Sequence, residues 1–328
     1  MCGCCGAHFA GGGGIDPNSK YGSAGDPDGP QAKTTGMTFN EGSITNDTLQ
    51  ALVGGSAWNN SQDITYALQF SDFNNNSIND WNEDGAGAAM RLAMALWDEV
   101  ANITLTEVAN TADANLVERI GDADGALGFH FFPNPNSTTT TSGGETLPPF
   151  TSPGEYNQDG RGWDSAGLAQ GGYGFITLIH EIGHGLGLEH PHDTDLLPGV
   201  LGEGDFGNFG LNQGVYTTMS YNDGWSLLGG GSSLDSFGWQ ATPMALDIAA
   251  VQAIYGADMT TRTGNDTYTL SDTNGPGTFF AAIWDAGGTD EITYSGVRDA
   301  FVFLGEATID QSATGGGLIS FVEGITGG

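Results

Sequence analysis

The residues with the clearest chemical potential lie in the string H-E-I-G-H-G-L-G-L-E-H-P, which runs from His180 to Pro191. His180 and His184 are four residues apart, so a helix places both imidazoles on one face, where they can bind one metal ion. Zinc takes histidine nitrogens at about 2.0–2.1 Å, which this spacing allows. Glu181 follows the first histidine and is expected to lie beside a water on that metal.

His190 completes the predicted zinc site only if the chain turns back, because six residues past His184 a continuing helix faces elsewhere. Gly187 can supply the turn, since glycine accepts the left-handed conformation at a helix end. Three histidines leave a fourth position open for water, as in catalytic zinc sites. With Glu181 as general base, the predicted chemistry is attack on a carbonyl group.

The charge balance narrows the class of partner. The chain has 40 acidic and 7 basic residues, a formal net charge of -33, which disfavours nucleic acid and anionic membrane surfaces. Two compatible interpretations of the acidity are solubility in a salty or extracellular medium and binding of divalent cations such as Ca²⁺.

The cysteines and the hydropathy bear on the compartment. Cys2, Cys4 and Cys5 are the only cysteines, so the rest of the chain has no disulfide framework, as in many proteins exported in one step from a bacterial cytoplasm. No stretch approaches 18 apolar residues, which argues against membrane insertion. The first 14 residues lack the basic and apolar regions of a Sec signal peptide.

Hydrophobic periodicity predicts the elements that must position the histidines. The 55 glycines, which follow no collagen period, argue for many turns and loops. The predicted helices are Gly85–Ala101, Tyr173–Gly187 and Pro243–Tyr255, and the predicted strands are Ile64–Ser71, Ile103–Val108, Ala114–Ile120 and Leu127–Phe132. Loops are expected over Asn134–Gly172 and Gly199–Gly238.

The domain organisation follows from changes in composition along the 328 residues. Residues 1–55 are rich in Gly, Asp, Pro, Ser and Thr and are expected to form a disordered leader or propeptide. A boundary is expected near Ala257, after which the sequence changes to short β segments and glycine turns. This mixture of helices and strands predicts an α+β fold with a main domain at 56–257 and a smaller unit at 258–328.

Several motifs together resemble one peptidase family. The string from His180 resembles the metzincin signature, and His190-Pro191 resembles the serralysins, secreted bacterial peptidases with a calcium-binding β-roll. Other stretches similar to that family are Trp97–Val108 (helix to strand), Thr217–Tyr221 (the Met-turn), Asp247–Gly256 (last catalytic helix), and Thr260–Gly264 and Trp284–Asp290 (opening of the β-roll). The resemblance covers about residues 56–328.

The resemblance implies a fold and a mechanism. At 56–257 it implies a metzincin catalytic domain, with a twisted mixed sheet, two long helices and the Met-turn; at 258–328 it implies the start of a β-roll or β-sandwich. Met219 would underlie the zinc site, and Tyr221 would ligate zinc at rest and later stabilise the oxyanion. The implied activity is that of a zinc endopeptidase: extended polypeptides add to the edge strand Leu127–Phe132, and a zinc-bound water attacks with Glu181 as base.

The family's calcium ligands carry over onto a short set of positions. These are the main-chain oxygens of Arg262 and Gly264, followed by Asp266, Asp285, Gly287, Gly288 and Asp290. The register around Asp266 is imperfect. Taken without the family, Asp285–Asp290 could equally be a solvated turn.

Two departures from the family concern the ends of the chain. The repeats of the β-roll and the C-terminal export signal do not occur before Gly328, so we expect a C-terminally truncated sequence of a protein secreted by type I export. The cysteine cluster Cys2–Cys5 could block zinc through a thiolate in a zymogen, or be an irrelevant disordered tip. The resemblance also implies a monomer, with a periplasmic peptidase inhibitor as a candidate partner.

Two other functional classes stay open. One is a catalytically silent, Ca²⁺-dependent adhesion module, against which the intact Glu181 and three histidines argue. The other is a zinc hydrolase with a non-peptide substrate, against which the Met-turn argues. Casein digestion with and without a chelator separates these classes.

Overall fold

The computed structural model describes residues 8–10, 34–59, 63–134, 141–142, 145–225 and 234–325. The helices are α1 (Asp47–Gln50), α2 (Ala86–Asp98), α3 (Tyr173–Gly185) and α4 (Ala245–Tyr255), and the 3-10 turns are η1 (Glu41–Ser43), η2 (Asp80–Asn82), η3 (Thr111–Asp113), η4 (Ala123–Gly125) and η5 (Asn208–Gly210). The strands are β1 (His8–Ala10), β2 (Gly36–Thr38), β3 (Ser56–Trp58), β4 (Ile64–Leu68), β5 (Leu105–Glu107), β6 (Leu116–Gly121), β7 (Gly128–His130), β8 (Thr141–Ser142), β9 (Glu145–Thr146), β10 (Ser152–Asn157), β11 (Thr267–Thr269), β12 (Phe280–Ala282), β13 (Glu291–Thr293), β14 (Ala300–Phe301) and β15 (Ile319–Val322).

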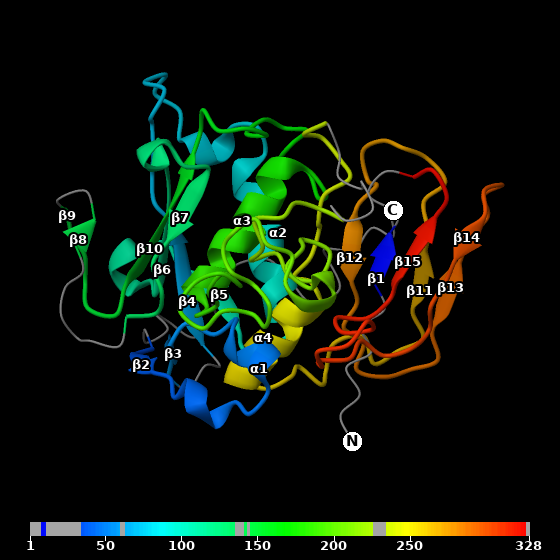
Figure 1. The fold of residues 1–328 in the computed structure, drawn as a ribbon. Helices are drawn as coiled ribbons and strands as arrows, with labels where there is room; N and C mark the ends of the chain where they lie inside the picture. The colour runs from blue at the N-terminus through cyan, green and yellow to red at the C-terminus, as the bar shows by residue number, and fades with distance from the viewer. Residues whose placement is uncertain are drawn as a thin grey trace.

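A five-stranded mixed sheet forms one side of the molecule (Figure 1). Its strand order is β5-β4-β6-β10-β7, and every neighbouring pair is parallel except β10 and β7. The predicted α+β class is therefore confirmed. β7 is the antiparallel edge strand that was expected within Leu127–Phe132, so its outer side is open to another extended chain.

The loop predicted over Asn134–Gly172 is wrong in one important part, because β10 lies within it. The strand sequence Ser-Pro-Gly-Glu-Tyr-Asn has no alternation of apolar residues and contains Pro153 and Gly154, which usually weaken a strand. Pairing on both sides, to β6 and to β7, forms the strand despite that local preference. Tertiary contacts thus override the local signal here.

The two long helices pack against each other and the sheet, with α3 at the centre of the molecule (Figure 1). Each helix has 13 residues. Both end earlier than predicted: α2 ends at Asp98 and not at Ala101, and α3 ends at Gly185 and not at Gly187. The apolar face of α3 is buried, and the Trp97 indole of α2 donates to the Ile179 carbonyl at 3.1 Å. This bond and the packing fix α3 rigidly enough to carry ligands.

The N-terminal part of the fold begins at least 22 residues before the predicted boundary at 56, because residues 34–55 are folded onto the main core. Asn46 caps α1, and Leu49, Leu52 and Val53 are buried in that core. The disorder expected for 34–55 is therefore wrong, and it is wrong for His8–Ala10 too, since β1 pairs with β12 and β15. The cysteines of the predicted zinc block, Cys2, Cys4 and Cys5, lie outside the described residues.

The residues after α4, joined by β1, form small sheets beside the part that contains α2 and α3 (Figure 1). One has the order β12-β1-β15-β14, and the other is the parallel pair β11-β13. Phe280, Trp284 and Ile319 belong to the main core cluster, so this segment packs against the helical part. Among the described residues, no helix has the length and apolarity needed to cross a membrane.

Candidate metal centre

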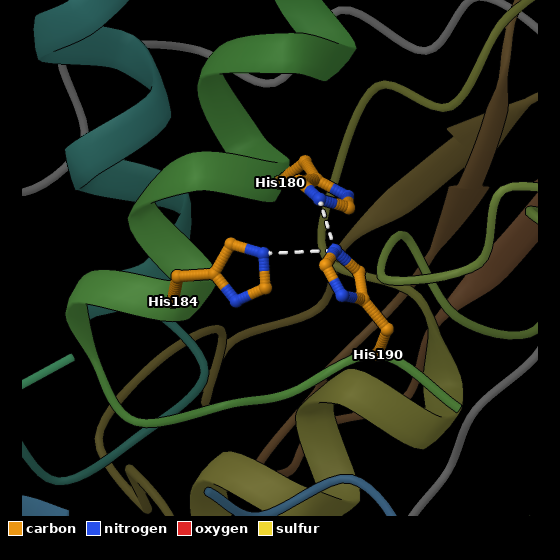
Figure 2. A group of neighbouring side chains, drawn as sticks. All are labelled: His180, His184 and His190. Atoms are coloured by element: carbon orange, nitrogen blue, oxygen red, sulfur yellow. Dashed lines mark hydrogen bonds between the residues drawn. The ribbon is translucent and has the colours of Figure 1, made fainter. Parts of the chain in front are cut away.

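Three histidine side chains meet at one point, as Figure 2 shows. His180 and His184 project from consecutive turns of α3, and His190 approaches from the segment that follows the helix. The Nε2 atom of His190 lies 3.1 Å from that of His180 and 3.0 Å from that of His184. The structure therefore brings together all three residues that the sequence predicted as metal ligands.

The protonation of these rings follows from what their other nitrogens contact. Each Nδ1 faces an acceptor: the Thr218 carbonyl at 2.7 Å for His180, the Leu188 carbonyl at 2.8 Å for His184, and Asp193 Oδ2 at 2.8 Å for His190. Each Nδ1 therefore holds the hydrogen, and the three Nε2 lone pairs point at one another.

Three converging lone pairs repel one another unless a cation lies between them, so the donor set fits a metal ion. Burial, followed by the neighbouring His190, lowers the pKa of His180 to about 4, which keeps this ring neutral and able to ligate. Neutral imidazoles with oriented Nδ1–H groups are the form that zinc binds.

The chain reversal between the second and third histidines occurs at Gly187, whose φ is +102°. A Cβ at this position would lie 2.4 Å from the Ser56 carbonyl oxygen, so only glycine fits both the turn and the contact with β3. The Leu188 N–H then donates to the Gly183 carbonyl at 2.9 Å. These constraints hold the ligands of the segment 184–190 in place.

The Met-turn lies directly beneath α3. Met219 is fully buried, and a Cβ on Gly183 would lie 2.7 Å from its sulfur, so the glycine inside the motif is what lets the turn approach. The Asp247 carboxylate accepts from the Thr217 hydroxyl at 2.6 Å and from the Thr218 and Met244 N–H groups at 2.7 and 2.8 Å. Asp247 therefore ties the Met-turn to the start of α4.

Sequence reasoning missed Gly183, Asp193 and Asp247 as members of the site. The signals were present: Asp193 follows the third histidine by three residues, and Asp247 is the one charged residue of the helix Ala245–Tyr255. Neither aspartate has the sequence spacing of a metal ligand. Only the fold shows that Asp193 binds the His190 ring and that Asp247 binds the Met-turn.

Glu181 lies at the metal pocket with one oxygen unused. Its side chain is only 5% exposed, and its Oε2 atom has no hydrogen-bond partner among the described residues. Burial raises the pKa of Glu181 to about 8, against the opposing effect of His130. A cation held by the three histidines would lower this pKa and favour the carboxylate, whose free oxygen then has the position that a general base requires.

A buried ion pair supports the pocket from the sheet side. The His130 Nε2 atom lies 3.3 Å from Glu118 Oε1, the Tyr156 hydroxyl donates to Glu118 Oε2 at 2.9 Å, and the His130 and Glu118 side chains are fully buried. Cβ atoms on Gly154 and Gly185 would lie 2.4 and 2.7 Å from the His130 ring. Two glycines thus make room for the His130 ring between the edge strand and α3.

Tyr221 lies on the solvent side of the histidines, 53% exposed. Its ring centroid is 4.6 Å from that of His190 and 5.9 Å from that of His180. Burial, followed by the charge of Glu181, raises its pKa, so the hydroxyl keeps its proton at neutral pH. His192 stacks on His190 at 5.0 Å and also faces Tyr221.

The residues predicted as calcium ligands also come together. Ligand atoms of Asp266, Asp285 and Asp290 lie within 4.8 Å of one another. Gly264 and Gly288 are in such close contact that a Cβ on Gly288 would overlap the Gly264 carbonyl. Two other residues of the predicted calcium set have positive φ, Arg262 (+48°) and Gly287 (+158°). The Arg262 side chain forms an ion pair with Glu99 at 2.8 Å.

Comparison with known proteins shows similarity to metallopeptidases. Residues 57–199 match the profile of the matrixin peptidases. The metallopeptidase AprA of Pseudomonas marginalis is 30% identical over 307 residues, which cover 84% of this chain and 60% of the relative. The serralysins of Photorhabdus luminescens and Proteus mirabilis are each 31% identical, over 73% and 71% of this chain.

The chain spans only part of these relatives. It covers 60% of the length of the AprA protein and 49% and 50% of the two serralysins. The matched part includes all three histidines, since the matrixin match ends at residue 199.

Proposed function

The chain belongs to the serralysin-like metzincins, and on this premise we propose that it is a zinc-dependent endopeptidase that hydrolyses extended polypeptides. One observation carries the proposal: three neutral imidazoles converge beside a buried carboxylate whose second oxygen has no partner among the described residues. Among the described residues no fourth histidine, cysteine or carboxylate joins this group, which favours a hydrolytic centre over a structural metal site.

In the proposed mechanism, His180, His184 and His190 would hold the zinc. When bound, zinc acidifies a water and polarises the carbonyl that is attacked. Glu181 accepts the proton of the attacking water on its free oxygen and passes it to the leaving amine. The open edge of β7 orients the substrate, because an extended peptide can pair with its main chain.

The test is casein digestion by zinc-loaded protein, with metal analysis of the same sample. Activity that disappears with a chelator and returns with zinc supports the proposal. A chain that binds zinc through the three histidines yet cleaves no peptide would contradict it.

Tyr221 is proposed to stabilise the oxyanion, since its ring faces two of the histidines and its hydroxyl keeps its proton. Tyr221→Phe is expected to lower kcat about 10–100-fold with little change in KM, because the hydroxyl acts mainly in the transition state. Steady-state kinetics on one peptide measure both constants. An unchanged kcat would remove Tyr221 from the mechanism.

We further propose a structural calcium site at Asp266, Asp285 and Asp290, with main-chain oxygens of Arg262, Gly264, Gly287 and Gly288. Three carboxylates within 4.8 Å of one another repel without a cation. The expected affinity is weak, with a Kd on the order of 10⁻⁴–10⁻³ M, so stabilisation should grow over millimolar calcium.

Thermal unfolding across a calcium titration measures this effect. Asp290→Asn should abolish the rise in Tm, whereas the exposed Asp63→Asn, which removes the same charge elsewhere, should keep it. A wild-type Tm that does not change with millimolar Ca²⁺ would mean that the three aspartates form only a solvated turn.

The same premise supports a secreted protein that is exported in one step and works as a monomer on protein or peptide substrates. The acidic composition fits an extracellular medium, and the absence of cysteine after Cys5 fits export in one step from a bacterial cytoplasm. A type I export route and an inhibitor of the periplasm as partner are proposed on the family resemblance alone, and removal of an N-terminal leader is proposed on the composition of that segment.

A further inference from the structure

A second hollow continues from the metal pocket along α3. It has a volume of about 380 Å³ and shares Gly128, His180, Glu181 and Tyr221 with the metal pocket. Tyr173 and Thr177 also line it, so it follows one helix face from His180 back to the first residue of α3. Seven residues of helix correspond to about 10 Å, which suits a long side chain.

The walls and floor of this groove differ in character. Leu127, Ile176 and the Tyr173 ring supply apolar wall. The floor includes the buried Gln240, whose Nε2 has no hydrogen-bond partner among the described residues. An unused buried amide marks a place where a polar atom of a ligand, such as a main-chain carbonyl, is expected.

The end of the groove carries a carboxylate. Asp223 lies exposed at the rim beside Tyr173, whose hydroxyl it accepts. The nearby cation is Arg161, which stacks over the Tyr173 ring at 4.0 Å and forms an ion pair with Asp235 at 2.7 Å. Asp223 and Asp235 both face the Arg161 guanidinium, so these three groups together carry a net charge of -1 beside this end of the groove.

The charge of the whole chain has the same sign. With 7 basic and 40 acidic residues, the surface potential attracts cationic peptides and repels anionic ones over distances longer than a contact. Long-range attraction does not determine which peptide bond is cleaved. A preference for one position in the peptide therefore requires a local contact, which Asp223 can provide.

The proposed mechanism places the groove relative to the scissile bond. Glu181 must come within hydrogen-bond reach of the leaving amine, so the residue that carries this amine lies next to Glu181. The groove opens at Glu181 and therefore receives the side chain that directly follows the scissile bond.

We propose that this groove selects a lysine or arginine directly after the scissile bond, and that Asp223 is the specificity-determining residue. The inference rests on the proposed peptidase function. The methylene stem of the substrate residue would lie along Leu127 and Ile176, and its charged end would pair with Asp223 at the rim.

The experiment uses three peptides that differ only at the residue after the scissile bond: lysine, its uncharged isostere norleucine, and glutamate. Zinc-loaded wild type should show a kcat/KM about 10-fold higher for lysine than for norleucine, and lowest for glutamate. Mass spectrometry of the products verifies the position of the cut. Repeating the assay from about 0.05 to about 0.5 M salt separates long-range attraction, which salt screens, from the contact.

Variants assign the preference to one residue. Asp223→Asn should bring the lysine-to-norleucine ratio to about 1, and Asp223→Lys should favour glutamate instead. The exposed Asp159→Asn removes a charge without lining the groove and should leave the ratio unchanged.

Binding to Glu181→Gln gives a readout that needs no hydrolysis. By fluorescence anisotropy, this variant should bind the lysine peptide about 10-fold more tightly than the norleucine peptide, and the added Asp223→Asn should remove the difference. Cleavage of norleucine and lysine peptides at equal rates, or a lysine preference that survives in Asp223→Asn, would overturn the inference. Failure to cleave any of the three peptides, with equal binding of all, would overturn it together with the proposed function.

Discussion

Glu181→Gln is expected to bind zinc as wild type does and to lose peptide hydrolysis by about 10²–10⁴-fold or more. The substitution keeps the size of the side chain but cannot take a proton from water. Because the three histidines are held by Thr218, Leu188 and Asp193 and not by Glu181, the metal site should stay intact.

The measurements are zinc content per chain and kcat/KM on a single peptide. Glu107→Gln is a suitable control, since Glu107 pairs with Arg91 away from the cleft and its loss should leave turnover unchanged. A Glu181→Gln protein with one zinc and wild-type turnover would rule out Glu181 as the base.

The zinc string could be predicted from sequence because its geometry is local. Helix spacing fixes His180 and His184, and a glycine after the helix allows the turn that returns His190. The three ligands therefore follow from about ten neighbouring residues. The strand within residues 127–132 was likewise predicted from its β-forming residues, whereas its antiparallel place at the sheet edge was implied only by the family resemblance.

The strand β10 could not be predicted in the same way. Its residues Pro153 and Gly154 argue against a strand, and only pairing with β6 and β7 makes one. The buried pair of His130 and Glu118 depends on this strand, because Gly154 of β10 leaves space for it. Contacts between residues far apart in sequence, not local propensity, decide this part of the site.

The support of His180 illustrates the same limit. Its Nδ1–H donates to the Thr218 carbonyl, and the Thr218 N–H donates to Asp247, which lies 29 residues further along the chain. Sequence spacing shows a methionine turn and a helix start but not the carboxylate that joins them. The orientation of a metal ligand thus depends on a buried residue that touches no metal.

Asp247→Ala is expected to weaken both the fold and the metal site. Three donors, from Thr217, Thr218 and Met244, would lose their acceptor in a fully buried place, at a cost of about 3 kcal/mol or more in the free energy of unfolding. Since the Met-turn would no longer hold the Thr218 carbonyl against His180, zinc affinity should fall about 10–100-fold.

Asp247→Asn should recover only part of this loss, because its amide group would direct a donor at the N–H groups that the carboxylate accepts. The matched control is Asp98→Ala, which removes another buried carboxylate that accepts from the Leu105 N–H at 2.8 Å, away from the histidines. Asp98→Ala should lower Tm and leave zinc affinity unchanged.

Zinc affinity is measured by competition with a chromophoric chelator, at a temperature where thermal unfolding shows each variant to be folded. If Asp247→Ala does not fold, Thr217→Val, which removes one of the three bonds, gives the same comparison with a smaller effect. Variants of Asp247 and Thr217 that lose stability but keep wild-type zinc affinity would show that the Met-turn braces the fold without orienting His180.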